Sequence, residues 1–215
     1  MFRSRRRDVV FPQADHAAFA GGIALLWGNG DFARPPLPFD SFVRAVALHD
    51  RGYGELDTAE IGAVEPEVWL RLQEAGFGVR DDDPVVDVVA SMHIRRLVSW
   101  WDEPRIVAAH AVMTEALPAL LERADVSEER VLAADAITNL CDRISFDVCC
   151  EERADGGVEI DGHRIVYMFD GARTVSVSPW PFAPDEGSLL LVGYRADGYP
   201  ERLQRIVEPI TLEPG

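Results

Sequence analysis

The last long helical stretch of the chain, residues 128–150, reads EERVLAADAITNLCDRISFDVCC, with Ser127 placed to cap it. Apolar residues recur on one side at helical spacing: Ala134, Ile137, Cys141, Ile144 and Val148. A polar stripe runs beside them: Asp135, Thr138, Asp142 and Ser145. Burying an isolated carboxylate is costly unless it is paired or binds a metal. The pattern therefore predicts that Asp142 lies beside the core and has a specific partner there.

Five more helices are predicted upstream of this one. Their approximate ranges are 13–28, 40–52, 66–75, 84–100 and 104–123. The fourth begins with a clear signal, because Asp83 can cap it and Pro84 suits the first helical position. The acidic run before Pro84 also favours the positive end of the helix dipole, so we assign it no chemistry.

The sequence texture changes after Glu152. Short runs rich in β-branched and aromatic residues lie at 158–160, 164–169, 174–178 and 188–194, separated by Gly, Asp and Pro. This pattern predicts a small antiparallel meander. We therefore expect a mainly α protein of about six helices with a small C-terminal antiparallel β extension. The expected division is a flexible basic N-terminal tail (1–12), a helical core (13–152) and a β-rich extension packed on the core (153–215).

The composition excludes several kinds of chemistry. The chain has 215 residues and a net charge of −16, and all 21 of its basic side chains are arginine. Without lysine it cannot be a P-loop, pyridoxal or protein-kinase type of enzyme. The acidity argues against nucleic acid as a partner, and no stretch has the length of a membrane span.

The cysteines and the N-terminus bear on location. The three cysteines fall within residues 141–150 without metal-knuckle spacing, which is usage typical of a reducing compartment. No apolar signal-peptide segment follows the N-terminal arginines. We expect a cytoplasmic protein with no membrane partner.

Histidine placement is the informative feature. His16, His49 and His93 lie on the apolar faces of three different predicted helices, and Asp50 follows His49 directly. Imidazoles and carboxylates that converge in a core can hold a divalent ion, one or two ligands from each helix. Such a mixed set suits Mn, Fe, Co, Ni or Zn. The competing interpretation is a set of buried polar residues that satisfy each other.

The order His16, His49-Asp50, Asp142 resembles the signature of the HD superfamily of metal-dependent phosphohydrolases. A closer resemblance is to an uncharacterised bacterial domain-of-unknown-function family with HD-like features. It is carried by Gln13–Ala17, His49–Tyr53, Ser91–His93, Asp142–Ser145 with Cys149, and Trp180–Phe182. The resemblance implies an HD-like helical bundle for residues 13–152. It also implies His16, His49, Asp50 and Asp142 as metal ligands, with His93 extending the metal site or binding substrate.

Other residues receive roles around this centre. Asp50 is a candidate to bridge two metals or to orient a water, and Arg95 or Arg96 to clamp a phosphate. Gln13, Tyr53 and Ser145 are the substrate-binding candidates. The two remaining histidines stay outside the site, with His110 expected in packing and His163 expected to be exposed.

Two functions from different classes follow. The first is a metal-dependent hydrolase of the HD type that acts on a small phosphorylated metabolite or nucleotide. The second is a non-catalytic helical domain that binds a small ligand or a protein and keeps the His/Asp cluster for structure. A di-iron oxygenase bundle is a weaker third, because it requires Glu-x-x-His pairs that the chain lacks. The oligomeric state is open, a dimer included.

Overall fold

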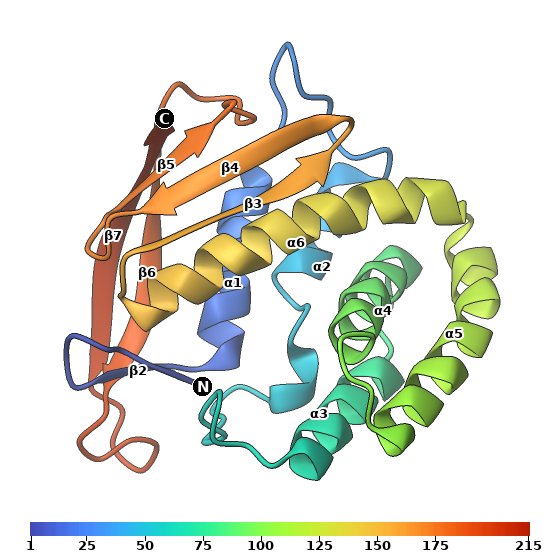
Figure 1. The fold of residues 1–215 in the computed structure, drawn as a ribbon, viewed down its shortest axis with the longest axis horizontal. Helices are drawn as coiled ribbons and strands as arrows, with labels where there is room; N and C mark the ends of the chain where they lie inside the picture. Colours follow the sequence, from blue (N-terminus) through green and yellow to red (C-terminus); the bar gives the residue numbers. More distant parts are fainter.

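The computed structural model describes all 215 residues (Figure 1). Its helices are α1 (Gln13–Leu25), α2 (Phe39–Val46), the 3₁₀ turn η1 (Arg51–Tyr53), α3 (Pro66–Gly78), α4 (Pro84–Val98), α5 (Pro104–Ala124) and α6 (Glu128–Cys150). Its strands are β1 (Phe2–Arg3), β2 (Val9–Phe11), β3 (Ala154–Ile160), β4 (His163–Phe169), β5 (Thr174–Ser178), β6 (Gly187–Arg195) and β7 (Arg205–Pro214).

The seven strands form one mixed sheet in the order β1-β2-β6-β7-β5-β4-β3. Its longest pair, β6 and β7, is antiparallel and aligns Leu189 with Ile210. The next pair, β5 and β7, is parallel and aligns Val175 with Leu212. The sheet curls around α1 and α6 (Figure 1). These helices pack on it through α1 against β6 and through α6 against β3.

The predicted fold class is wrong in its β component. Six α-helices are present, but the chain is not a mainly helical, HD-like bundle with a small C-terminal antiparallel extension. The sheet takes strands from both ends of the chain, and the parallel β5–β7 pair breaks the expected meander. Strand β7 carries Pro209 at its centre and β1 has two residues, so neither shows the alternation that reveals a strand in sequence.

The N-terminal residues also differ from the expected free tail. Strand β1 pairs with β2, and β2 pairs with β6, so residues 2–11 extend the sheet. Phe2 and Phe11 are buried. Arg7 binds Glu151 at the end of α6, and Arg7 Nη1 donates to Glu208 Oε1 on β7 at 2.7 Å. The arginine run is therefore not free: Arg6 donates to the Gly171 carbonyl, and Arg7 links the end of α6 to the sheet.

The helix boundaries agree well with the sequence signals where a cap exists. Asp83 accepts a hydrogen bond from the Val85 amide at the start of α4, and Ser127 accepts one from the Arg130 amide at the start of α6. Helix α2 is the exception. It ends at Val46 rather than at Gly52, which leaves His49 and Asp50 in the turn that follows.

Helix α6 packs against both the other helices and the sheet. It contacts α1, α2 and α4 as well as β1, β3 and β4, and its Cys141, Ile144 and Val148 are fully buried. One hydrophobic cluster of 39 buried residues includes side chains from α1, α2, α4, α5, α6 and the sheet. This packing brings Asp142 on α6 against α1, α4 and the turn after α2. None of the helices is long and apolar enough to cross a membrane.

Candidate metal centre and pocket

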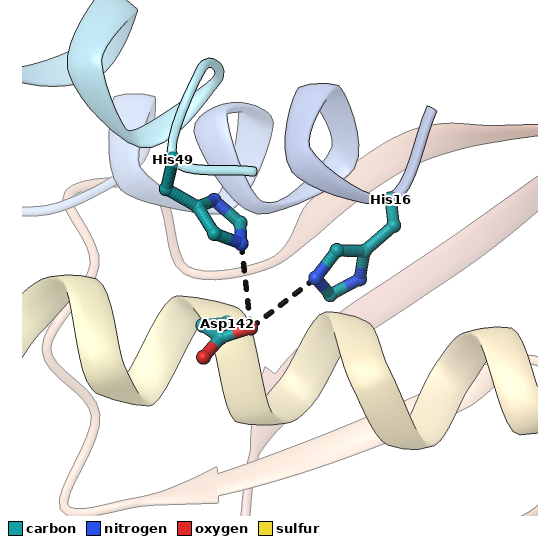
Figure 2. A group of neighbouring side chains, drawn as sticks. All are labelled: His16, His49 and Asp142. Atoms are coloured by element: carbon teal, nitrogen blue, oxygen red, sulfur yellow. Dashed lines mark hydrogen bonds and ion pairs between the residues drawn. The ribbon is translucent and has the colours of Figure 1, made fainter. Parts of the chain in front are cut away.

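Five titratable side chains from four segments meet at the centre of the molecule. His16 comes from α1, His49 and Asp50 from the turn after α2, His93 from α4 and Asp142 from α6. All three imidazoles are at most 1% exposed. Figure 2 shows His16 and His49 converging on Asp142. The fold therefore brings together the residues whose order resembles the HD signature.

His16, His49 and Asp142 direct ligand atoms to one point, and Asp50 lies in a second such group with His49 and His93. Asp142 Oδ1 lies 3.2 Å from His16 Nε2 and 3.4 Å from His49 Nε2. Asp50 Oδ2 lies 3.5 Å from His49 Nε2 and 3.7 Å from His16 Nε2. Ligand atoms about 2.0–2.2 Å from a shared ion in tetrahedral geometry stand about 3.3–3.6 Å from one another. The observed separations match such a ligand set.

Hydrogen bonds on the far side of each ring fix which nitrogen faces the carboxylates. His49 Nδ1 donates to the Val46 carbonyl at 2.6 Å. Ser145 Oγ donates to the His16 carbonyl at 2.8 Å and accepts from His16 Nδ1 at 2.7 Å. In a neutral ring the proton therefore sits on Nδ1, and the lone pair on Nε2 faces the carboxylates. His16 Nε2 also lies at hydrogen-bond distance, 3.2 Å, from Asp142 Oδ1, and it can donate to that oxygen only when it carries a proton. Outer hydrogen bonds of this kind orient metal-binding histidines.

His93 is arranged differently. Arg96 Nη2 donates to His93 Nδ1 at 3.0 Å, which places the proton of the neutral ring on Nε2. That atom lies 3.4 Å from Asp50 Oδ1 and has no hydrogen-bond partner. Arg96 is itself held by Asp135 and Asn139. In this arrangement His93 Nε2 can donate a hydrogen bond beside Asp50, and His93 also belongs to a group with His49 and Asp50 that could hold a metal ion.

The pKa values show how strongly the cluster is coupled. Burial opposes ionisation of Asp142 and Asp50, but the surrounding histidines outweigh it, and both pKa values fall, that of Asp142 well below its usual range. Burial also opposes a charge on His49, but Asp50 and Asp142 raise its pKa to about 9. Burial and the neighbouring His49 lower the pKa of His93. The two carboxylates thus stay ionised, and a proton on His49 balances part of their charge when no metal is bound.

The residues fit a divalent ion. His49 Nε2 is fully buried and has no hydrogen-bond partner, although two carboxylate oxygens lie within 3.5 Å. A lone pair and carboxylates that face each other repel unless a cation or a proton lies between them. Two imidazole nitrogens and two carboxylate oxygens suit Mn, Fe, Co, Ni or Zn. His16, His49, Asp50 and Asp142 would hold the ion.

A pocket of about 460 Å³ opens beside this centre. Six of the predicted site residues line it: Gln13, His16, Asp50, Tyr53, His93 and Asp142. The pocket therefore reaches the carboxylates from one side. His49 and Ser145 lie behind them and contribute from within the core.

The predicted phosphate clamp has other contacts. Neither Arg95 nor Arg96 lines the pocket. Arg95 contacts Thr114 Oγ1 and Met92 Sδ, and Arg96 is held by Asp135. The two remaining histidines are also apart from the site: His110 is half-buried on α5, and His163 is exposed.

The substrate-binding candidates have mixed surroundings. Gln13 is 2% exposed, and its Oε1 atom has no hydrogen-bond partner. Tyr53 accepts a hydrogen bond from Gln73 Nε2 at 3.2 Å, and burial raises its pKa. Ser145 is occupied by His16. Gln13 is thus the candidate with a free polar atom beside the pocket.

Sequence reasoning missed the rest of the pocket. Its wall contains Trp69 from α3, Trp100 and Trp101 from the α4–α5 connection, and Arg143 and Phe146 from α6. Two features of the sequence could have indicated these pocket residues. Trp100-Trp101 is a tryptophan pair just beyond the helix that carries His93, and Arg143 follows Asp142 directly.

Fold and site define a mixed α/β protein in which a buried His/Asp cluster forms the floor of an aromatic pocket. The chain belongs to the family described as "Protein of unknown function (DUF3891)", which matches residues 2–193. This confirms the resemblance to a family of unknown function. Its HD-like character stays a prediction. No curated protein and no solved structure matches the chain.

Proposed function

We propose that this protein is a metal-dependent hydrolase that acts on a small phosphorylated molecule. Its ligands would be His16, His49, Asp50 and Asp142. One observation carries the proposal: the Nε2 atoms of two histidines, whose Nδ1 atoms are held from behind by hydrogen bonds, face two ionised carboxylates at 3.2–3.7 Å. The resemblance of these four residues to the HD phosphohydrolase signature supplies the reaction type.

A divalent ion in such a site lowers the pKa of a water molecule and polarises a phosphoryl oxygen. The side chains around it have separate tasks. Asp50 directs Oδ2 at the ligand set and Oδ1 at His93, so it can orient a water at the edge of the pocket. His93, with its proton on Nε2, can donate a hydrogen bond to a substrate oxygen. Gln13 offers an unpaired amide to the same space.

A second function is favoured by one observation, the engagement of Arg96. Its guanidinium bonds Asp135, Asn139 and His93, and it does not line the pocket. A phosphate-transfer site usually offers cationic forks to its substrate, and in this pocket only Arg143 remains for that role. The alternative is therefore a protein that binds metal and a small ligand at this pocket without turnover.

Metal reloading separates the two. The purified protein would be stripped with a chelator, reloaded with Mn, Fe, Co, Ni, Zn or Mg, and assayed for phosphate release from a set of phosphate mono- and diesters. We expect turnover with at least one metal and none with Asp142→Asn. Asp185→Asn, an exposed aspartate outside the pocket, is the matched control and keeps full activity. Metal binding without turnover of any ester supports the alternative.

The proposal includes a cytoplasmic location. Cys141, Cys149 and Cys150 are free thiols, and burial raises the pKa of each. Buried, protonated thiols suit a reducing compartment.

A further inference from the structure

The side chains that line the pocket change from polar at its floor to aromatic at its mouth. The floor is the His/Asp cluster. The mouth is aromatic and partly open: Trp100 is 65% exposed, Phe146 41% and Trp101 40%. These rings come from two segments, the α4–α5 connection and α6, and all line the same cavity. Large apolar side chains gathered at the edge of a concave site indicate a ligand surface.

Two of the rings already form a continuous wall. The ring centroids of Trp69 and Trp101 lie 5.2 Å apart with 35° between their planes. Trp100, the neighbour of Trp101, adds a third indole to the lining. Flat rings gain from offset stacking on such surfaces in addition to the area that they bury. A volume of about 460 Å³ accommodates one small organic ligand.

The charges of the lining limit the charge of the ligand. Four charged side chains line the pocket: Asp50, Asp142, Asp147 and Arg143. Asp147 accepts a hydrogen bond from Tyr167 at 2.5 Å, whereas Arg143 is exposed and forms no ion pair. One divalent ion balances Asp50 and Asp142, and Arg143 balances Asp147. The loaded pocket then has no net charge, and Arg143, its only cationic side chain besides the histidines, can bind one anionic group of a ligand.

A buried polar atom also indicates a ligand. The Gln13 Oε1 atom has no hydrogen-bond partner, and its side chain is among those that line the cavity. A buried acceptor without a partner is unfavourable unless a ligand or water supplies a donor. Gln13 begins α1, one turn before His16, and both side chains line the pocket.

We propose that the pocket takes a small ligand in which a flat aromatic ring is joined to a group with one negative charge. The ring stacks on the wall formed by Trp69, Trp100 and Trp101. The charged group lies between Arg143 and the metal centre, near Gln13. This inference deepens the proposed function and rests on it for the orientation of the charged group. Stacking on the wall does not depend on turnover.

The test uses ligands in which the ring is joined to phosphorus by a carbon–phosphorus bond. A phosphoesterase therefore cannot separate the ring from the charged group. The monomethyl ester of phenylphosphonic acid carries one charge and a flat ring, and its cyclohexyl counterpart has the same charge without a flat ring. Three of the five tryptophans line the pocket, so intrinsic fluorescence reports binding directly. Titrations with and without Zn²⁺ would be compared.

We expect the phenyl compound to bind about three- to tenfold more tightly than the cyclohexyl compound. Trp100→Ala removes most of this preference, and Trp100→Phe keeps it. Leu25→Ala, an exposed apolar residue outside the pocket, changes nothing. Arg143→Gln weakens both compounds by about tenfold or more, because it removes the charge-assisted hydrogen bond.

Equal affinities for the phenyl and cyclohexyl compounds would overturn the inference, as would tighter binding of phenyltrimethylammonium, a flat ring with a positive charge. Tighter binding of doubly charged phenylphosphonate at pH 8.5 would also contradict it. If esters are hydrolysed without an aromatic preference, this inference fails and the proposed function stands. If the preference appears but no metal binds, the proposed function fails and the aromatic wall stands.

Discussion

Two buried clusters in this molecule contain carboxylates, and they balance the negative charge of these carboxylates in different ways. Asp87 on α4 is fully buried and is held by two arginines: Arg51 Nη1 donates to Oδ1 at 2.9 Å, and Arg123 donates to Oδ2. The Asp81 amide adds a third bond. Asp50 and Asp142 face imidazoles instead, and the nearest guanidinium, that of Arg96, lies 3.9 Å from Asp142 Oδ2.

The difference lies in whether the positive charge is permanent. A guanidinium stays protonated at all ordinary pH values, so the Asp87 cluster is complete and closed. An imidazole can lose its proton, and the lone pair that it then presents is a metal ligand. The fold thus contains one carboxylate cluster that is closed by permanent cations and one whose imidazoles can exchange a proton for a metal ion. The four predictions below test this contrast, from the largest expected effect to the smallest.

The first concerns the structural cluster. Asp87→Ala leaves Arg51, whose side chain is 7% exposed, without its carboxylate. Breaking one partner of a buried pair costs about 3–5 kcal/mol of unfolding free energy. Urea unfolding measures this loss, and it should be the same with and without Zn²⁺. A loss below about 1 kcal/mol would mean that the two clusters do not differ as described.

The second concerns the metal cluster. His49 lies outside the pocket lining, so His49→Gln tests it as a ligand without removing a substrate contact. If four ligands share a binding free energy of about 10–16 kcal/mol, the loss of one weakens metal affinity by about 10²–10³-fold. Competition with a coloured chelator measures the affinity. The Asp87→Ala protein, where folded, should bind metal as the wild type does, and unchanged affinity in His49→Gln would remove the contrast.

The third concerns the support behind the ligands. Ser145 fixes the proton of His16 on Nδ1. Ser145→Ala should lower metal affinity by about 10–100-fold without removing a ligand. The same competition assay applies, with Ser91→Ala as a control, because the Ser91 hydroxyl is buried but has no hydrogen-bond partner to lose. Equal affinities of these two variants would show that the Ser145 bond does not support the site.

The fourth is a pH dependence. The pKa of His49 is raised to about 9, so in the metal-free protein at pH 7 its Nε2 carries a proton that the metal must displace. The apparent metal affinity should therefore rise by about tenfold per pH unit between pH 7 and 9 and level off above. Calorimetry in buffers of different ionisation enthalpy counts the released proton. No proton release at pH 7 would contradict the raised pKa.

The metal-free stability should change in the opposite direction. A raised pKa in the folded state stabilises the protein below the unfolded value of about 6.5. That contribution is lost as the pH rises through about 9. Metal should therefore stabilise the protein most at alkaline pH, where the imidazole proton no longer balances the carboxylates.

The sequence was a good guide to the residues of the His/Asp cluster because each carries a local signal. His16 lies at helical spacing from apolar neighbours, Asp50 adjoins His49, and Asp142 belongs to a polar stripe on a capped helix. The structure brings these residues together. Their binding of metal stays a prediction.

The sheet could not be read in the same way, because its pairing is not local. Strand β2 pairs with β6 across most of the chain, and the parallel β5–β7 contact has no turn to announce it. Contacts of this kind depend on packing rather than on neighbouring residues. The pocket wall could not be predicted for the same reason, since Trp69 and Trp101 come together only in the folded state. Arg96 was assigned to substrate because nothing local indicates its partner Asp135.

The account depends most on a cation between the imidazoles and the carboxylates. Crystals grown with Zn²⁺ or Mn²⁺ and measured on both sides of the metal absorption edge test this directly. We predict one anomalous peak about 2.0–2.2 Å from His16 Nε2, His49 Nε2 and oxygens of Asp50 and Asp142. No peak at this position, with the four side chains hydrogen-bonded to one another, would contradict the metal centre and every function built on it.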